Sequence, residues 1–222
     1  RLNEMMEDKS FKKSEALNIK LFQAYYYHSL IHHNYGNFTE GMPYVKAMEQ
    51  GLTLYKERMH SMGVVMLCFY AFHVCFGAAD YVYAYKWLQQ ILAHNSSNIR
   101  QDIYNFAKIL KLITVYELGD RQLLSKTIKS TYAFLYKKEQ QYQLESLILR
   151  FLKQVSKIKE KTQVQTLFKE VLLDLQALKQ DPMQGRVFAY FDFIAWVYSQ
   201  TNEKSFKQII LDGGIIDETN SA

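Results

Sequence analysis

The sequence contains little of what tight turns require. Glycine occurs nine times and proline twice in 222 residues, whereas all-β domains and dinucleotide-binding α/β domains need these residues at many turns. Both of these fold classes are therefore disfavoured. Long helices joined by short turns need few such residues, and a hydrophobic content of 49% is enough for a core. We expect an all-α protein.

Cysteine is equally rare. Cys68 and Cys75 stand seven positions apart, which is about 10.5 Å along a helix and too far for a disulfide bond. Both lie in the apolar run 64–76, so we expect them to be buried free thiols. Free thiols fit a reducing, cytoplasmic location.

Long apolar runs and a strong charge imbalance are also absent from the sequence. Lys, Arg, His or Gln interrupts every apolar stretch before it reaches the ~18 residues of a membrane span, so we expect no membrane insertion. The formal net charge is +5, and the basic residues are scattered apart from a group in 153–161. Without a basic stripe and a recognisable motif, nucleic acid is not an expected partner. The sequence begins at Arg1 without a signal-like segment, and we expect it to be a fragment of a longer protein.

Helix-breaking turns recur at a regular interval along the chain. Anchors at Asn37, Asp80, Asp120, Lys161 and Asn202 are separated by 43, 40, 41 and 41 residues. Regular spacing of this kind is typical of repeat architectures. In three of the five turns, glycine or another small residue comes just before Asn or Asp. This order predicts a left-handed residue that closes one helix and a capping side chain that begins the next.

Further breaks lie between these anchors, near His60 and in 95–98, 139–140 and 181–182. They divide each repeat into two helices, and apolar residues at i, i+3, i+4 and i+7 within the segments support this interpretation. The predicted helices cover 11–35, 38–57, 61–77, 80–94, 98–118, 121–138, 141–159, 163–179, 184–200 and 203–211.

The helix pairs predict one elongated domain. We expect a right-handed α-solenoid of about five antiparallel pairs over 11–211, with a lead-in at 1–10 and a tail at 212–222. Because the ends of such an array expose apolar faces, copies of the chain could associate through them. The repeats cover 11–57, 61–94, 98–138, 141–179 and 184–211.

Two of the turns resemble the tetratricopeptide repeat. Residues 27–41 end a helix, turn at Gly36-Asn37-Phe38 and place Gly41 where that family has a small residue. The segment 79–84 has the same order, with Ala84 in the small position.

The other repeats depart from the family pattern. The third turn keeps Gly119-Asp120, but Arg121 replaces the aromatic residue and Leu124 the small one. The last two repeats keep only the spacing. The spacing of the anchors, 40 to 43 residues, is also longer than the family repeat of 34 residues.

The resemblance implies a non-catalytic scaffold that binds a protein or a peptide in its concave groove, which is lined by the first helix of each pair. The groove so implied is aromatic and polar in its first half, which predicts hydrophobic anchors in the ligand. Arg150, Gln154 and Lys157 share one helix face and make the groove cationic at the fourth repeat, which predicts an acidic end. Alignment on the turns gives the groove candidates Gln23, Tyr26, His33, Asn34, Phe69, His73, Asn105, Lys108, Arg150, Gln154 and Lys157.

The sequence has no nucleophile elbow and no phosphate-binding loop, and we expect neither an enzyme nor a bound cofactor or metal. Two alternatives stay open. One is a sensor or regulatory solenoid of a transcriptional or signalling protein whose effector domain lies outside this sequence. The other is a helical-bundle metal enzyme with His28, His32, Asp192 or Glu117 as ligands. The i, i+4 spacing of the two histidines suits a metal, although packing between helices explains them as well. Asp192 is expected to face solvent on a helix.

Overall fold

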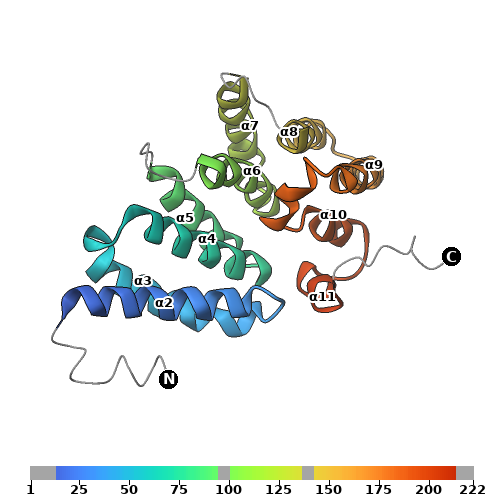
Figure 1. Cartoon of the computed structure of the whole chain (residues 1–222). Coiled ribbons are helices and arrows are strands. Elements are labelled where there is room, and N and C mark those ends of the chain that lie inside the picture. Colours follow the sequence, from blue (N-terminus) through green and yellow to red (C-terminus); the bar gives the residue numbers. More distant parts are fainter. Residues whose placement is uncertain (1–13, 95–100, 137–142, 214–222) are drawn as a thin grey trace. The chain divides into compact units, whose positions relative to one another are not determined.

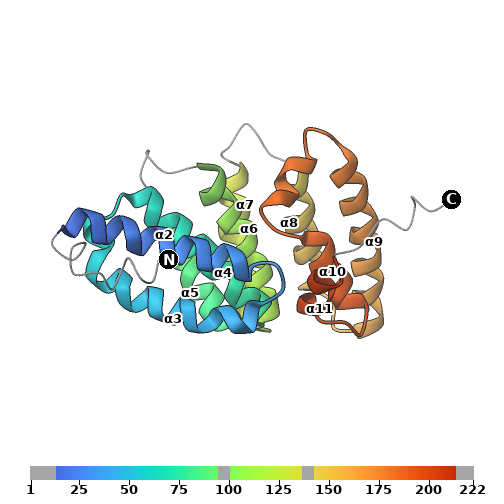
Figure 2. The same ribbon diagram turned by 60° about the horizontal axis from the view of Figure 1, so that its bottom comes forward.

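The computed structural model describes residues 14–94, 101–136 and 143–213, and all regular elements in these ranges are helices (Figures 1 and 2). This confirms the all-α prediction. None of the described helices is both long enough and apolar enough to cross a membrane. In chain order the elements are α2 (Glu15–His33), α3 (Phe38–Tyr55), the 3-10 helix η2 (Lys56–Arg58), α4 (Ser61–Gly77), α5 (Tyr81–Ala93), α6 (Gln101–Glu117), α7 (Arg121–Tyr136), α8 (Gln143–Val155), α9 (Lys161–Gln180), the 3-10 helix η3 (Gly185–Ala189), α10 (Phe193–Thr201) and α11 (Phe206–Leu211).

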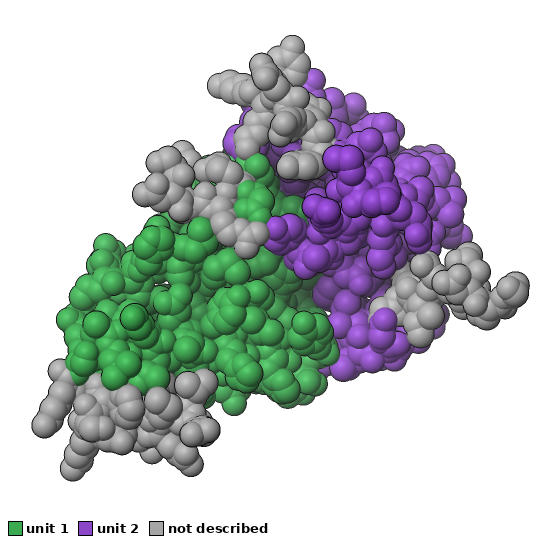
Figure 3. Space-filling view, viewed as in Figure 1, with its two compact units in different colours: residues 1–108 green, residues 109–222 purple. Residues whose placement is uncertain are grey.

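The chain forms two compact units, 1–108 and 109–222, which are coloured separately in Figure 3. The boundary between them falls inside α6. The stacking of all helix pairs into one right-handed solenoid stays a prediction.

The turns that predicted the helix pairs have the expected backbone. Gly36, Ala79 and Gly119 have φ values of 101°, 58° and 70°, in the left-handed region. The aspartates that follow two of them are N-caps. Asp80 accepts a hydrogen bond from the backbone N–H of Tyr83 at 3.0 Å, and Asp120 accepts one from that of Leu123 at 2.8 Å. Asn37 also begins a helix, but its side chain makes no capping hydrogen bond.

Unit 1 is built around α4, which packs against α2, α3 and α5. This helix is apolar on almost every side, as expected for a helix enclosed by others. Both predicted free thiols, Cys68 and Cys75, lie buried in it. Glycine lets the backbones approach, because a Cβ atom at Gly77 would overlap the Phe38 ring of α3. Burial also raises the pKa of the Cys68 thiol to about 12, so this thiol is protonated and unreactive at neutral pH.

Unit 2 is built around an aromatic cluster. The Phe151 ring of α8 meets the Phe168 ring of α9 edge to face at a centroid distance of 4.8 Å, and Trp196 of α10 lies 5.9 Å from Phe168. Trp196 is almost fully buried, and its indole N–H donates to Glu117 Oε1 at 2.6 Å. The Gln200 side-chain amide donates to the same oxygen at 2.9 Å. The Glu117 carboxylate therefore joins the end of α6 to α10.

The predicted helix 184–200 is wrong in its first half. Residues 185–189 form the short helix η3, and α10 begins only at Phe193. The reason is side-chain capping. Asp192 Oδ1 accepts a hydrogen bond from the Ala195 N–H at 2.8 Å and so begins a new helix there. Asp192 is thus an N-cap and not a residue on the solvent face of a helix.

Helix α8 is also shorter than the predicted 141–159. It ends at Val155, and Lys157 lies in the turn that follows. Positions 11–13, 95–100 and 137–142, where several other predicted ends fall, lie outside the described residues.

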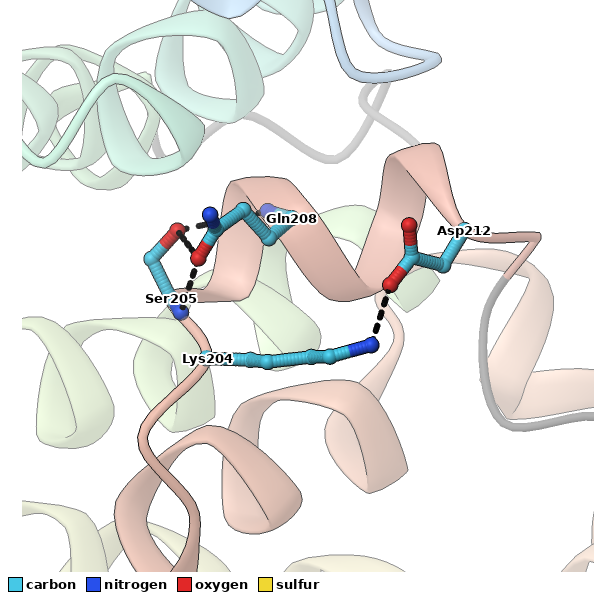
Figure 4. Close-up of polar contacts among 4 residues, drawn as sticks. All are labelled: Lys204, Ser205, Gln208 and Asp212. Atoms are coloured by element: carbon cyan, nitrogen blue, oxygen red, sulfur yellow. Dashed lines mark hydrogen bonds and ion pairs between the residues drawn. The ribbon is translucent and has the colours of Figure 1, made fainter.

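The last described helix, α11, has a capping box (Figure 4). The Gln208 N–H donates to Ser205 Oγ at 3.3 Å, and the Gln208 side-chain oxygen accepts from the Ser205 N–H at 3.1 Å. Lys204 and Asp212 pair at 2.6 Å across the same short helix. The two bonds of the capping box satisfy backbone N–H groups that the first turn of a helix leaves without partners.

We predict that Ala79→Gly stabilises unit 1 by about 0.5–1 kcal/mol. An alanine in the left-handed conformation costs roughly 1–2 kcal/mol, which the substitution relieves. The greater conformational freedom of glycine in the unfolded chain offsets about 0.4–1 kcal/mol of this gain. Urea unfolding followed by circular dichroism measures the change. The matched control is Ala78→Gly, because Ala78 has a φ of −80° and should lose stability. A destabilised Ala79→Gly protein would contradict the prediction.

We also predict that Glu117→Ala destabilises unit 2 by about 1–3 kcal/mol, because it removes the acceptor of the buried Trp196 N–H and of the Gln200 amide. Glu117→Gln retains an acceptor oxygen and should lose less. Urea unfolding monitored by tryptophan fluorescence compares the two variants. Equal losses in both would show that hydrogen bonding to this oxygen is not the cause.

Candidate binding cleft

Helices α8 and α9 pack together through the apolar stripes of their sequences. In α8 the stripe contains Leu144, Ile148 and Leu152, and in α9 it contains Val171 and Leu175, all of them buried. The polar residues of each helix stay at the outer edges. Between the polar edge of α8 and that of α9 there is an open cleft.

The cleft has two adjoining parts. The larger has a volume of roughly 570 Å³ and the smaller one of roughly 300 Å³. Leu147, Arg150 and Asp174 line both parts, so the two hollows form one continuous surface. The larger part is also lined by Gln143, Ser146, Ala177, Leu178 and Asp181, and the smaller by Phe151, Gln154, Leu167, Glu170 and Val171.

The floor and the walls of the cleft differ in polarity. Apolar atoms of Leu147, Phe151 and Leu178, all buried residues, form the floor. Charged and amide side chains, which are exposed, form the walls. This combination can take up an apolar side chain and at the same time hydrogen-bond to the groups beside it.

Of the three groove candidates in unit 2, Arg150 and Gln154 come together in the wall of this cleft. Lys157 does not line it, because α8 has ended before that position. The charge of the cleft also differs from the sequence interpretation of this region as cationic. Glu170 and Asp174 of α9 face the same cleft as Arg150.

The carboxylates of α9 were not identified as lining residues from the sequence, because the turn alignment assigned the groove to the first helix of each pair only. The signal was nevertheless present in the sequence. Glu170 and Asp174 stand four residues apart, and Asp181 follows seven residues later, a spacing that places them along one edge of a helix.

In unit 1 the candidates of α2 are engaged in packing. The Tyr26 ring packs at a tilt against the Phe22 ring, with a centroid distance of 4.9 Å, and desolvation by burial is the main cause that raises the pKa of the Tyr26 hydroxyl. The Gln23 side chain lies against the backbone of Gly63 at the start of α4. The first of these contacts lies within α2, and the second joins α2 to α4.

The two candidates at the end of α2 also face protein atoms. His33 Nδ1 is 2.6 Å from the carbonyl oxygen of Ser29, and the His33 ring lies 4.9 Å from that of Tyr44 in α3. The side-chain oxygen of Asn34 is buried and makes no hydrogen bond with the described residues.

The candidates of α4 belong to the core. Phe69 is buried, and the part-buried His73 has ring centroids of Phe69 and Phe72 at 4.6 and 5.1 Å. Desolvation by burial lowers the pKa of His73 to about 3, so the imidazole is neutral at physiological pH. In α6, Lys108 Nζ lies over the Tyr104 ring at 5.1 Å, and Asn105 is part-buried on the same helix.

The residues named for a metal enzyme do not form a shared site. Within the described ranges, no group of three or more His, Cys, Asp or Glu side chains could hold a metal ion. His28 and His32 are exposed on α2. Asp192 caps α10, and the Glu117 carboxylate accepts hydrogen bonds from Trp196 and Gln200.

A polar cluster in unit 1 links α3 to α5. The Tyr83 hydroxyl donates to Glu49, and Lys86 forms an ion pair with the same carboxylate. Partial burial acts to raise the pKa of Glu49, but the contacts with Lys86 and Tyr83 together outweigh it and lower the pKa. All three groups satisfy one another, which indicates a structural role.

The low pKa of His73 predicts that unit 1 loses stability in acid. Between pH 6.5 and pH 3 the unfolded chain binds a proton at His73 that the folded chain does not, so the free energy of unfolding falls as pH falls. We expect His73→Gln to reduce the loss between pH 7 and pH 5 by roughly 1–2 kcal/mol. Urea unfolding at both pH values tests this, with the exposed His28→Gln as control. An unchanged pH dependence in His73→Gln would contradict it.

A comparison with protein-family models, with curated proteins and with solved structures found no match for the chain.

Proposed function

We propose that this chain is a non-catalytic scaffold that binds a segment of another protein, and that its helix pairs stack as a tetratricopeptide-like α-solenoid. The observation that carries the proposal is the cleft between α8 and α9. It is open to solvent, has an apolar floor and polar walls, and includes Arg150 and Gln154 among its lining residues. Grooves between neighbouring helices are a common site for a partner's helix or extended segment.

The shape of the cleft supports a side chain of a partner protein as its occupant. It runs along the α8–α9 pair from Asp181 to Leu167, which corresponds to roughly four turns of α9. A segment that lies along it would place one or two side chains on the Leu147 and Leu178 floor. Its backbone would then lie beside Gln154, Gln143 and Ser146, which can hydrogen-bond to peptide groups.

The backbone turns support the stacking part of the proposal. Gly36, Ala79 and Gly119 each follow a helix in the left-handed conformation, and α3, α5 and α7 each begin two residues later. Repeated closure of helix pairs in one manner is what an array of similar hairpins requires.

We predict that Ala177→Trp lowers the affinity for a cleft-binding peptide at least tenfold. Ala177 is exposed and lines the cleft, so the indole would fill the space without entering the core. Peptides selected on the wild-type chain from a phage-displayed library of random 12-residue sequences serve as probes, and fluorescence anisotropy measures their binding. The matched control is Ala133→Trp, at an exposed alanine of α7.

The two tryptophan variants separate binding at the cleft from binding elsewhere. Loss of affinity in Ala177→Trp with retention in Ala133→Trp is the expected pattern. Circular dichroism must show equal helix content in both. If every selected peptide binds the Ala177→Trp chain as well as the wild type, the cleft is not the binding surface.

A further inference from the structure

The charged groups of the cleft are predominantly acidic. Three carboxylates, those of Glu170, Asp174 and Asp181, line it together with one guanidinium group, that of Arg150. All three carboxylates belong to α9 or its C-cap. The cleft therefore carries an excess of negative charge along one wall, although the whole chain has a formal net charge of +5.

Two of these carboxylates are available to a ligand. Glu170 and Asp174 are exposed, and neither forms an ion pair or a hydrogen bond with the described residues. Asp181 is already engaged, since its Oδ1 accepts from the N–H groups of Met183 at 2.8 Å and Gln184 at 3.1 Å. The available pair stands at i, i+4, so the two groups are about one helical turn apart on one edge of α9.

Lys153 and Lys157 do not neutralise this wall. Lys153 Nζ lies over the Tyr132 ring of α7 at 5.7 Å, on the side of α8 that faces α7. Lys157 is beyond the end of α8, and neither lysine lines the cleft. Among the described residues that line the cleft, Arg150 is the single cation.

We propose that the cleft binds a segment carrying lysine or arginine, with the cationic head group between Glu170 and Asp174. This inference rests on the proposed function and adds the charge of the partner. The aliphatic stem of such a side chain would cover the floor at Leu147 and Leu178, because long basic side chains bury their methylene groups while the head stays polar. Arg150 on the opposite wall would meet a carbonyl or carboxylate oxygen of the same segment.

The carboxylate pair on this wall should discriminate between ligands by the sign of their charge. A cation at the carboxylate pair gains charge-assisted hydrogen bonds, whereas an acidic side chain there would meet two like charges. The net charge of the whole chain favours the opposite ligand at long range, because +5 attracts acidic peptides. Local and overall electrostatics therefore predict opposite preferences, and an experiment can distinguish them.

The test uses the same random 12-residue phage library and sorts the selected peptides by their sensitivity to Ala177→Trp. Among the sensitive peptides we expect enrichment of lysine and arginine over aspartate and glutamate. Replacing the basic residues of such a peptide with glutamate should weaken binding at least tenfold in fluorescence anisotropy. The double variant Glu170→Gln/Asp174→Asn should weaken the original peptide at least tenfold.

A charge-matched double variant, Glu57→Gln/Glu203→Gln, is the control. Both residues are exposed and lie outside the cleft, so the variant changes the net charge by the same amount without altering the cleft. Equal weakening by both double variants would attribute the effect to net charge and overturn the inference.

The remaining outcomes separate the inference from the proposed function. Ala177→Trp-sensitive peptides that are acidic, or that bind Glu170→Gln/Asp174→Asn as tightly as the wild type, would overturn the charge assignment while the binding cleft stands. Failure to find any sensitive peptide would overturn both proposals.

Discussion

The contact between the Phe151 and Phe168 rings determines how α8 and α9 lie against each other, and the candidate cleft depends on it. These rings meet edge to face at 4.8 Å, and Trp196 of α10 lies against Phe168 from a third helix. Bulky aromatic side chains in the interface hold the two helices apart on their outer edges. The small residues Ser146 and Ala177 on those edges do not fill the space. A cleft with an apolar floor is the direct consequence.

Side-chain capping hydrogen bonds stabilise the segment that connects α9 to α10 at both of its ends. Asp181 accepts from Met183 and Gln184 after α9, and Asp192 caps α10. Both aspartates hydrogen-bond to backbone N–H groups, which stabilises the turn and the new helix start that bring α10 back onto α9. One of them, Asp181, also lines the cleft. The residue that ends α9 thus contributes charge to the surface as well as shape to the fold.

The sequence predicts helices better than it predicts the cleft. The left-handed turns at Gly36, Ala79 and Gly119 are local features, and neighbouring residues are enough to recognise them. The break before Phe193 was missed because the aromatic run 188–193 has a helical apolar pattern, while the Asp192 cap that interrupts it is a single polar residue. His73 and Phe69 were assigned to a groove by resemblance to a family with shorter repeats, and here α4 is enclosed by three other helices. Which side of a helix meets its neighbours depends on the whole unit, not on the helix alone.

The charge of the cleft illustrates this limit most clearly. In the predicted helix 141–159 taken alone, Arg150 and Lys157 form a basic face, and an acidic ligand follows from them. Packing places Glu170 and Asp174 opposite Arg150, while Lys153 lies over Tyr132 on the other side of α8. Electrostatic interactions within a few ångströms are stronger than those of distant surface charges, which salt screens over about 10 Å. The sign of charge that a ligand meets is therefore decided by the pairing of two helices, and neither helix carries that information by itself.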